Sequence, residues 1–201
     1  MKLALIDYGA GNLPSVERAL GRLGVAAVRA DTPNKLDGAD AIVLPGVGHF
    51  ASMVRTLRER DLLAPLRETI ERGAPFLGIC LGLQALYESS DEAPGESGLG
   101  LLPGQVRLLP ANVKLPHIGW NQLQLLRPSR LLSGVDRDAY FYFAHSFAAT
   151  APDGAAAAVC NYGAEFAAAI EQDNLFAVQF HPEKSGDAGA RVLANFLEAA
   201  R

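Results

Sequence analysis

One cysteine in this sequence has the surroundings of an enzyme nucleophile. Cys80 lies in the segment GICLG (78–82), between an apolar run and an amphipathic stretch. A sharp strand-to-helix turn, with a glycine two positions away on each side, is the thiol version of the nucleophile elbow. A helix N-terminus favours the thiolate, and the N–H of Leu81 would face a developing oxyanion. Free cysteines are often structural, and we predict that role for Cys160, which lies in an alanine-rich run.

A thiol nucleophile needs a base and a group that orients the base. His181 ends the apolar run LFAVQF and is followed by Pro182 and Glu183. The proline stops the strand from continuing, and the nearby carboxylate can fix the imidazole tautomer. The alternative is a turn histidine beside a solvated glutamate, but the Cys80 elbow favours a catalytic pair.

The other histidines are weaker candidates for the base. His145 is the only rival, and no carboxylate lies close to it in the sequence. We expect His49, which follows a glycine, to open a helix, and His117 to lie in a loop with a structural role.

A second loop could complete an oxyanion hole. Pro-Gly-Val-Gly (45–48) follows an apolar run and precedes a helical pattern. Glycines let backbone N–H groups turn toward a pocket, although an ordinary strand-to-helix turn would look the same. Sites in open α/β sheets form beyond the carboxyl ends of the strands, so we expect this loop, Cys80 and His181 to meet at one edge.

The N-terminal glycines resemble a dinucleotide fingerprint only superficially. Gly9 and Gly11 follow a strand pattern, and Asp31 comes about 20 residues later. Pro14 occupies the place of the third glycine. The sequence also has no Walker-type loop and no Cys/His cluster with metal-ligand spacing. We therefore expect neither a cofactor nor a metal.

The elements that must position these residues alternate between strand and helix patterns. Strands are predicted at 2–6, 25–29, 41–44 and 74–79, and helices at 15–23, 49–60, 62–72 and 81–89. Beyond residue 98 the pattern predicts short strands at 122–126, 139–143, 155–161, 165–171 and 175–180, with turns at 152–154 and 173–174, and a last helix at 188–200. We expect an α/β fold with an open, mixed, mostly parallel sheet flanked by helices, in one domain covering residues 1–201.

Composition excludes several functional classes. The chain has 201 residues, 49% hydrophobic and 20% charged, as in ordinary globular proteins. A net charge of −4 does not favour nucleic-acid binding, and no stretch is long enough to cross a bilayer. The first ten residues do not form a signal peptide. We expect a cytoplasmic protein with reduced thiols.

These motifs together resemble the class I (triad) glutamine amidotransferases, with a flavodoxin-like core. GICLGLQ, PGVG and HPE carry the resemblance, which covers essentially the whole chain. Five further segments are similar to the glutaminase subunits of imidazole glycerol phosphate synthase in histidine biosynthesis: DYGAGNL (7–13), LPGVGHF (44–50), HIGWNQL (117–123), FAHSF (143–147) and QFHPEKSG (179–186).

The resemblance implies specific roles. Cys80 would attack the glutamine carboxamide, His181 would act as base and then acid, and Glu183 would orient His181. The Val47 peptide would complete the oxyanion hole with Leu81, and its N–H can face away until a partner binds. The positions that match glutamine-binding residues of the family are Gly48, Gln84, Glu92, His145, Ser146 and Phe147. Phe147 replaces a common tyrosine, so only its backbone role is carried over.

The resemblance also implies a partner. Asn12, Trp120 and Lys184 match positions near an interface and an ammonia gate. The partner would be a (β/α)₈-barrel cyclase that forms a heterodimer with this chain and uses the ammonia. Two other functions stay open: a glutaminase that serves another synthase, such as pyridoxal phosphate synthase, and a non-catalytic regulatory module on the same fold.

Overall fold

A mixed sheet forms the centre of the molecule. The structure is a computed structural model that describes residues 1–150 and 154–201. Within them the main sheet has eight strands, in the order β2-β1-β3-β4-β13-β12-β11-β8. The pairings from β2 to β13 are parallel, and those from β13 to β8 are antiparallel. The parallel strands are β1 (Leu3–Ile6), β2 (Ala27–Ala30), β3 (Ala41–Gly46), β4 (Phe76–Cys80) and β13 (Leu175–Val178); the others are β8 (Gln124–Leu125), β11 (Ala156–Asn161) and β12 (Glu165–Gln172).

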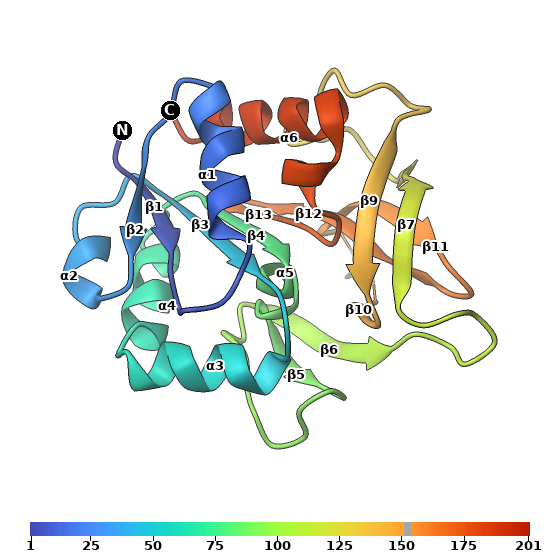
Figure 1. The fold of residues 1–201 in the computed structure, drawn as a ribbon, viewed down its shortest axis with the longest axis horizontal. Coiled ribbons are helices and arrows are strands. Elements are labelled where there is room, and N and C mark those ends of the chain that lie inside the picture. The colour runs from blue at the N-terminus through green and yellow to red at the C-terminus, as the bar shows by residue number, and fades with distance from the viewer. Residues whose placement is uncertain (151–153) are drawn as a thin grey trace.

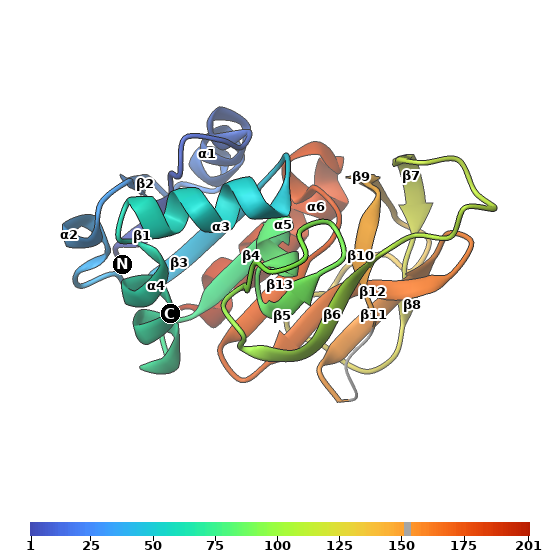
Figure 2. The ribbon, with the colours of Figure 1, turned by 90° about the horizontal axis from the view of Figure 1, so that it is seen from below.

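Helices cover both faces of the parallel strands. Helices α1 (Leu13–Arg22) and α6 (Gly186–Ala199) lie on one face, and α3 (Phe50–Glu59) and α4 (Leu63–Glu71) lie on the other, as Figures 1 and 2 show. Successive strand side chains point to opposite faces, so the strands supply two apolar layers. In β3, Ile42 and Leu44 face α3, whereas Ala41 and Val43 face α1.

Two smaller sheets extend the fold beyond the main sheet. One contains β5 (Tyr87–Ser90), β6 (Leu102–Leu108) and β10 (Phe147–Ala149). The other is an antiparallel ribbon of β7 (His117–Gln122) and β9 (Tyr140–His145). Both lie to the right of the parallel strands in Figure 1. A short helix, α2 (Pro33–Leu36), follows β2, and a 3₁₀ turn, η1 (Pro182–Lys184), precedes α6.

The predicted alternation and the α/β class are confirmed, but three local predictions are wrong. The helix expected at 81–89 is only α5 (Leu81–Gln84), after which the chain forms β5. The N–H of Leu99 donates to the carbonyl of Ala85, and those of Leu101 and Leu102 donate to the carbonyl of Leu86, which diverts the chain into the second sheet. His117 lies in a strand rather than a loop, and the strand expected at 122–126 is shortened to β8. Helix α2 and strand β6 were not predicted.

Other expectations about local structure have clear outcomes. The final helix is confirmed as α6, with its apolar side buried. The 173–174 turn joins β12 to β13, with φ +52° at Asp173. The turn expected at 152–154 lies mostly outside the described residues. None of the helices in residues 1–150 and 154–201 is long and apolar enough to span a bilayer.

Candidate active site

Cys80 stands on a strained turn between β4 and α5. It has φ +54° and ψ −105°, a region that residues with a Cβ rarely occupy. The strand and the helix approach so closely that a Cβ on Gly78 would overlap the Gly82 backbone, and one on Gly82 would overlap the carbonyl of Leu44. The glycines therefore bring β3, β4 and α5 together, and Leu81 opens the helix with an N–H that has no intrahelical acceptor.

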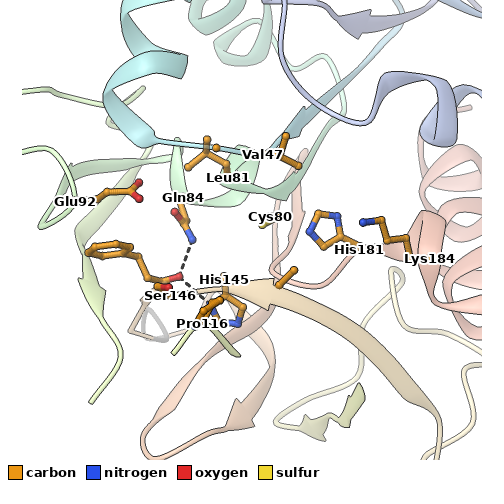
Figure 3. Close-up of a pocket in the computed structure, with 13 residues that line it drawn as sticks. Val47, Cys80, Leu81, Gln84, Glu92, Pro116, His145, Ser146, His181 and Lys184 are labelled. Atoms are coloured by element: carbon orange, nitrogen blue, oxygen red, sulfur yellow. Dashed lines mark hydrogen bonds between the residues drawn. The ribbon is translucent and has the colours of Figure 1, made fainter. Parts of the chain in front are cut away.

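His181 and Glu183 follow strand β13, which lies beside β4. The Nδ1 atom of His181 lies 3.0 Å from Oε1 of Glu183, and both side chains are buried. The carboxylate holds Nδ1 protonated, which leaves Nε2 for another partner. Figure 3 shows the imidazole of His181 beside Cys80, and both residues line one pocket.

The main chain of His181 is also fixed. Its N–H donates to the carbonyl of Tyr142 at 2.9 Å. The hydroxyl of Ser185 accepts from the N–H of Tyr142 at 3.0 Å and donates to the carbonyl of His181 at 2.7 Å. The main chain of His181 is therefore anchored to strand β9 through both its N–H and its carbonyl.

The charge state of His181 follows from its neighbours. Burial alone would lower the pKa of His181, but hydrogen bonds and charge attraction with Cys80 and Glu183 outweigh burial and raise the pKa to about 10. The imidazolium form is therefore favoured near neutral pH. This arrangement can hold a thiolate and then supply a proton to a leaving group.

The loop that follows β3 presents Val47 to the same pocket. The N–H of Val47 donates to the hydroxyl of Tyr8 at 3.2 Å, and that hydroxyl lies 3.4 Å from the carbonyl of Val47. Gly48 has φ +95°, which gives the loop a backbone shape that favours glycine. The predicted second oxyanion donor is thus adjacent to Cys80 and is engaged by Tyr8 in this structure.

A cavity of about 320 Å³ joins these groups. Of the residues predicted for the site, those that line the cavity are Val47, Gly48, Cys80, Leu81, Gln84, Glu92, His145, Ser146, Phe147, His181 and Lys184. Glu183 lies behind His181, and Asn12 and Trp120 do not line the cavity.

Polar groups within the cavity are anchored by specific bonds. The Nε2 atom of Gln84 donates to the carbonyl of Phe147 at 2.7 Å, shown by a dashed line in Figure 3. Glu92 accepts from the N–H of Phe50, at the start of α3, at 2.8 Å. These contacts hold an amide and a carboxylate at the cavity wall, about where a small polar substrate would need them.

His145, the rival base, is excluded by its contacts. Its Nδ1 lies 2.9 Å from the Phe147 carbonyl and its Nε2 lies 3.2 Å from Nδ1 of His117, so both ring nitrogens are occupied. Burial lowers the pKa of His145 to about 3. His117 is stacked between Phe143 and Tyr162. His49 caps α3 as predicted, and its Nδ1 accepts from the N–H of Ala51.

Of the three residues expected at an interface, Lys184 lines the cavity and the other two lie outside it. Trp120 is 55% exposed on the β7–β9 ribbon, and its ring packs edge-on against Tyr142. Lys184 places its ammonium over the ring of Tyr142, 5.3 Å from the centroid. Asn12 caps α1. As predicted, Cys160 is buried in β11, and burial raises its pKa to about 12.

Sequence reasoning missed three residues of the site: Tyr8, Gln179 and Ser185. Gln179 was detectable, because it is a single amide inside an apolar run and lies two positions before His181. Tyr8 and Ser185 gave no comparable signal, since their roles depend on contacts with distant segments.

Comparisons with known proteins bear on the whole chain. The family model described as glutamine amidotransferase class-I matches residues 4–200. The HisH subunit of imidazole glycerol phosphate synthase from Moorella thermoacetica is 48% identical over 200 residues, which cover 99% of this chain and 95% of that protein. The HisH subunit from Methanothermobacter thermautotrophicus is 50% identical over 199 residues, which cover 99% of both chains.

Solved structures share the fold at lower identity. A crystal structure of a glutamine amidotransferase superposes with a TM-score of 0.79 at 22% identity, covering 98% of each chain. The arrangement of the sheet and of the covering helices is therefore one that experimentally determined proteins adopt.

Proposed function

We propose that this chain, which belongs to the class I glutamine amidotransferase family, is the glutaminase subunit of imidazole glycerol phosphate synthase in histidine biosynthesis. One observation carries the proposal: Cys80 on its strained turn and His181 backed by Glu183 meet at one cavity, in a chain nearly half identical to HisH subunits along its length. In this role residues 1–201 act as one glutaminase domain in the cytoplasm.

The reaction follows from the charges at the site. The thiolate of Cys80 attacks the carboxamide carbon of glutamine, and the carbonyl oxygen becomes an oxyanion that the N–H groups of Leu81 and Val47 stabilise. The imidazolium of His181 gives its proton to the amide nitrogen, which leaves as ammonia and leaves a thioester on Cys80.

The second half of the cycle restores the enzyme. Water attacks the thioester carbon while the neutral imidazole of His181 takes a proton from the water. The bond to sulfur breaks, glutamate leaves, and the thiolate is again paired with the imidazolium. Glu183 keeps the imidazole oriented in both halves.

Substrate recognition is assigned to the walls of the cavity. Gly48, Gln84 and Glu92 form one side, and the backbone of His145, Ser146 and Phe147 forms the other. The carboxylate of Glu92 suits the α-ammonium of glutamine, because opposite charges attract strongly in a partly enclosed site.

The ammonia is delivered to a (β/α)₈-barrel cyclase, with which this chain forms a heterodimer. Asn12, Trp120 and Lys184 contribute to that interface. The exposed side chain of Trp120 supports this assignment, since tryptophan is enriched among the energetic centres of interfaces.

The test measures glutamate and ammonia from glutamine, with and without a purified cyclase. Cys80→Ala should abolish turnover, and Cys160→Ala should leave it unchanged. Normal turnover by Cys80→Ala would disprove the assignment of the nucleophile. Failure of the cyclase to gain ammonia, while a different synthase does, would redirect the proposal to another acceptor.

A further inference from the structure

Gln179 lies against the sulfur of Cys80 and has no role in the reaction described above. It follows β13 directly and its side chain is fully buried. Its Nε2 atom lies 3.5 Å from Sγ of Cys80. His181 follows two positions later and also contacts Cys80, so one short segment after β13 brings both side chains to the sulfur.

A backbone carbonyl fixes which end of the Gln179 amide faces the sulfur. The oxygen of Phe147 can only accept, so Gln84 must direct its NH₂ group toward it, at 2.7 Å. The same NH₂ group lies 3.1 Å from Gln179. Gln179 must therefore offer Gln84 its oxygen, which leaves its own NH₂ group toward Cys80.

The reversed orientation would be unfavourable at both ends. Two NH₂ groups would face each other between Gln84 and Gln179, and an amide oxygen would face the sulfur. Because the amide is buried, a lost hydrogen bond there has no replacement from water. The orientation that donates to sulfur is thus fixed before any substrate enters.

From this geometry we propose that Gln179 is a further catalytic residue of the site, whose amide donates a hydrogen bond to the Cys80 thiolate and holds the sulfur in position for attack. The inference rests on the proposed function for its reaction, but the contact itself needs only a reactive thiolate. His181 supplies one donor to the sulfur and Gln179 supplies a second, uncharged one. A donor to the charged form favours that form.

Two substitutions separate this role from a structural one. Gln179→Met removes the donor and the acceptor with little change in length. Gln179→Glu keeps an oxygen for Gln84 but replaces the donor with an oxygen that repels a thiolate. Gln172→Glu, at the exposed end of β12, adds the same charge away from the site. Circular dichroism and thermal unfolding establish that each variant is folded.

The first readout is alkylation of Cys80 by iodoacetamide across a pH series, followed by mass spectrometry. Buried Cys160 should stay unmodified in the same spectra, which verifies that the protein remains folded during the reaction. Loss of a hydrogen bond to the charged thiolate should make the thiolate less favourable, so we expect alkylation about 10- to 150-fold slower at neutral pH in Gln179→Met. In Gln179→Glu the rate profile should move to higher pH, and Gln172→Glu should match the wild type.

The second readout is glutaminase activity in the assembled complex. The proposal predicts a lower kcat in both Gln179 variants, with KM for glutamine nearly unchanged. Folded Gln179 variants with the wild-type alkylation profile would overturn it, as would a raised KM with normal kcat. If the wild type released no ammonia with any synthase, the proposed function would fail, while the alkylation comparison would still test the contact with sulfur.

Discussion

Replacing Tyr8 with phenylalanine removes the group that engages the N–H of Val47. The hydroxyl of Tyr8 accepts that N–H at 3.2 Å and is itself buried. In Tyr8→Phe the N–H loses its acceptor, so the orientation that directs it away from the cavity is no longer stabilised by that bond. The conformer whose Val47 N–H points into the cavity should then be more populated, and that N–H can stabilise the oxyanion that forms during turnover.

The size of the effect follows from the bond that is lost. A neutral hydrogen bond contributes about 0.5–1.5 kcal/mol net, which corresponds to about a 2- to 12-fold change in a population. A complete oxyanion donor is worth on the order of 10²–10³ in rate, so the gain is limited by how often the peptide turns. We therefore expect the partner-free chain to hydrolyse glutamine about 2- to 12-fold faster.

The assay compares ammonia release by the free chain and by the complex. In the complex the gain should be smaller, because the family resemblance implies that the partner already favours the turned peptide. Tyr162→Phe is the matched control, since it removes a hydroxyl that donates to the carbonyl of Lys114 at 2.8 Å and does not touch the loop. An unchanged or slower free Tyr8→Phe variant would refute the reasoning.

Three other predictions concern charge, packing and pH. Glu183→Gln removes the negative charge that helps to raise the pKa of His181, so steady-state kinetics should show kcat lower by on the order of 10²–10⁴ with KM little changed; a normal kcat would contradict this. Gly82→Ala places a Cβ on the carbonyl of Leu44, and urea denaturation should show a loss of about 1–3 kcal/mol or more, whereas an unchanged midpoint would contradict the close contact. Because the pKa of His181 is raised to about 10, its stabilising contribution is complete below about 6.5 and is lost as the pH rises through about 10. The free energy of unfolding should therefore fall over that range, less steeply in Cys80→Ala, and an equally steep fall in that variant would contradict the coupling.

The sequence was most informative where local pattern and chemistry agree. Strand–helix alternation predicted the parallel part of the sheet, and parallel strands necessarily place their carboxyl ends on one edge. Cys80 and His181 each end a strand pattern, so their proximity could be inferred without coordinates. The strained turn at Cys80 was likewise predictable from its flanking glycines.

Prediction failed where distant segments decide the local structure. The 81–89 pattern suits a helix, but N–H groups of three leucines between 99 and 102 bind the carbonyls of Ala85 and Leu86, and the second half forms a strand. Gln179 stands out in the sequence as an amide inside an apolar run, yet its orientation depends on Gln84, 95 positions earlier in the chain. Contacts of this kind cannot be obtained from spacing.

The hydrogen bonds that anchor His181 differ in how strongly they restrict the residue at each position. Position 142 anchors the main chain of His181 through its own peptide groups, which any residue with an extended backbone there would supply. The aromatic ring at that position contacts Trp120 and Lys184, and its centroid lies 6.3 Å from that of the His181 imidazole. Side chains at position 142 can therefore change to suit a different binding partner while the main chain of His181 stays anchored. Ser185 is more constrained, because it acts through its side-chain hydroxyl.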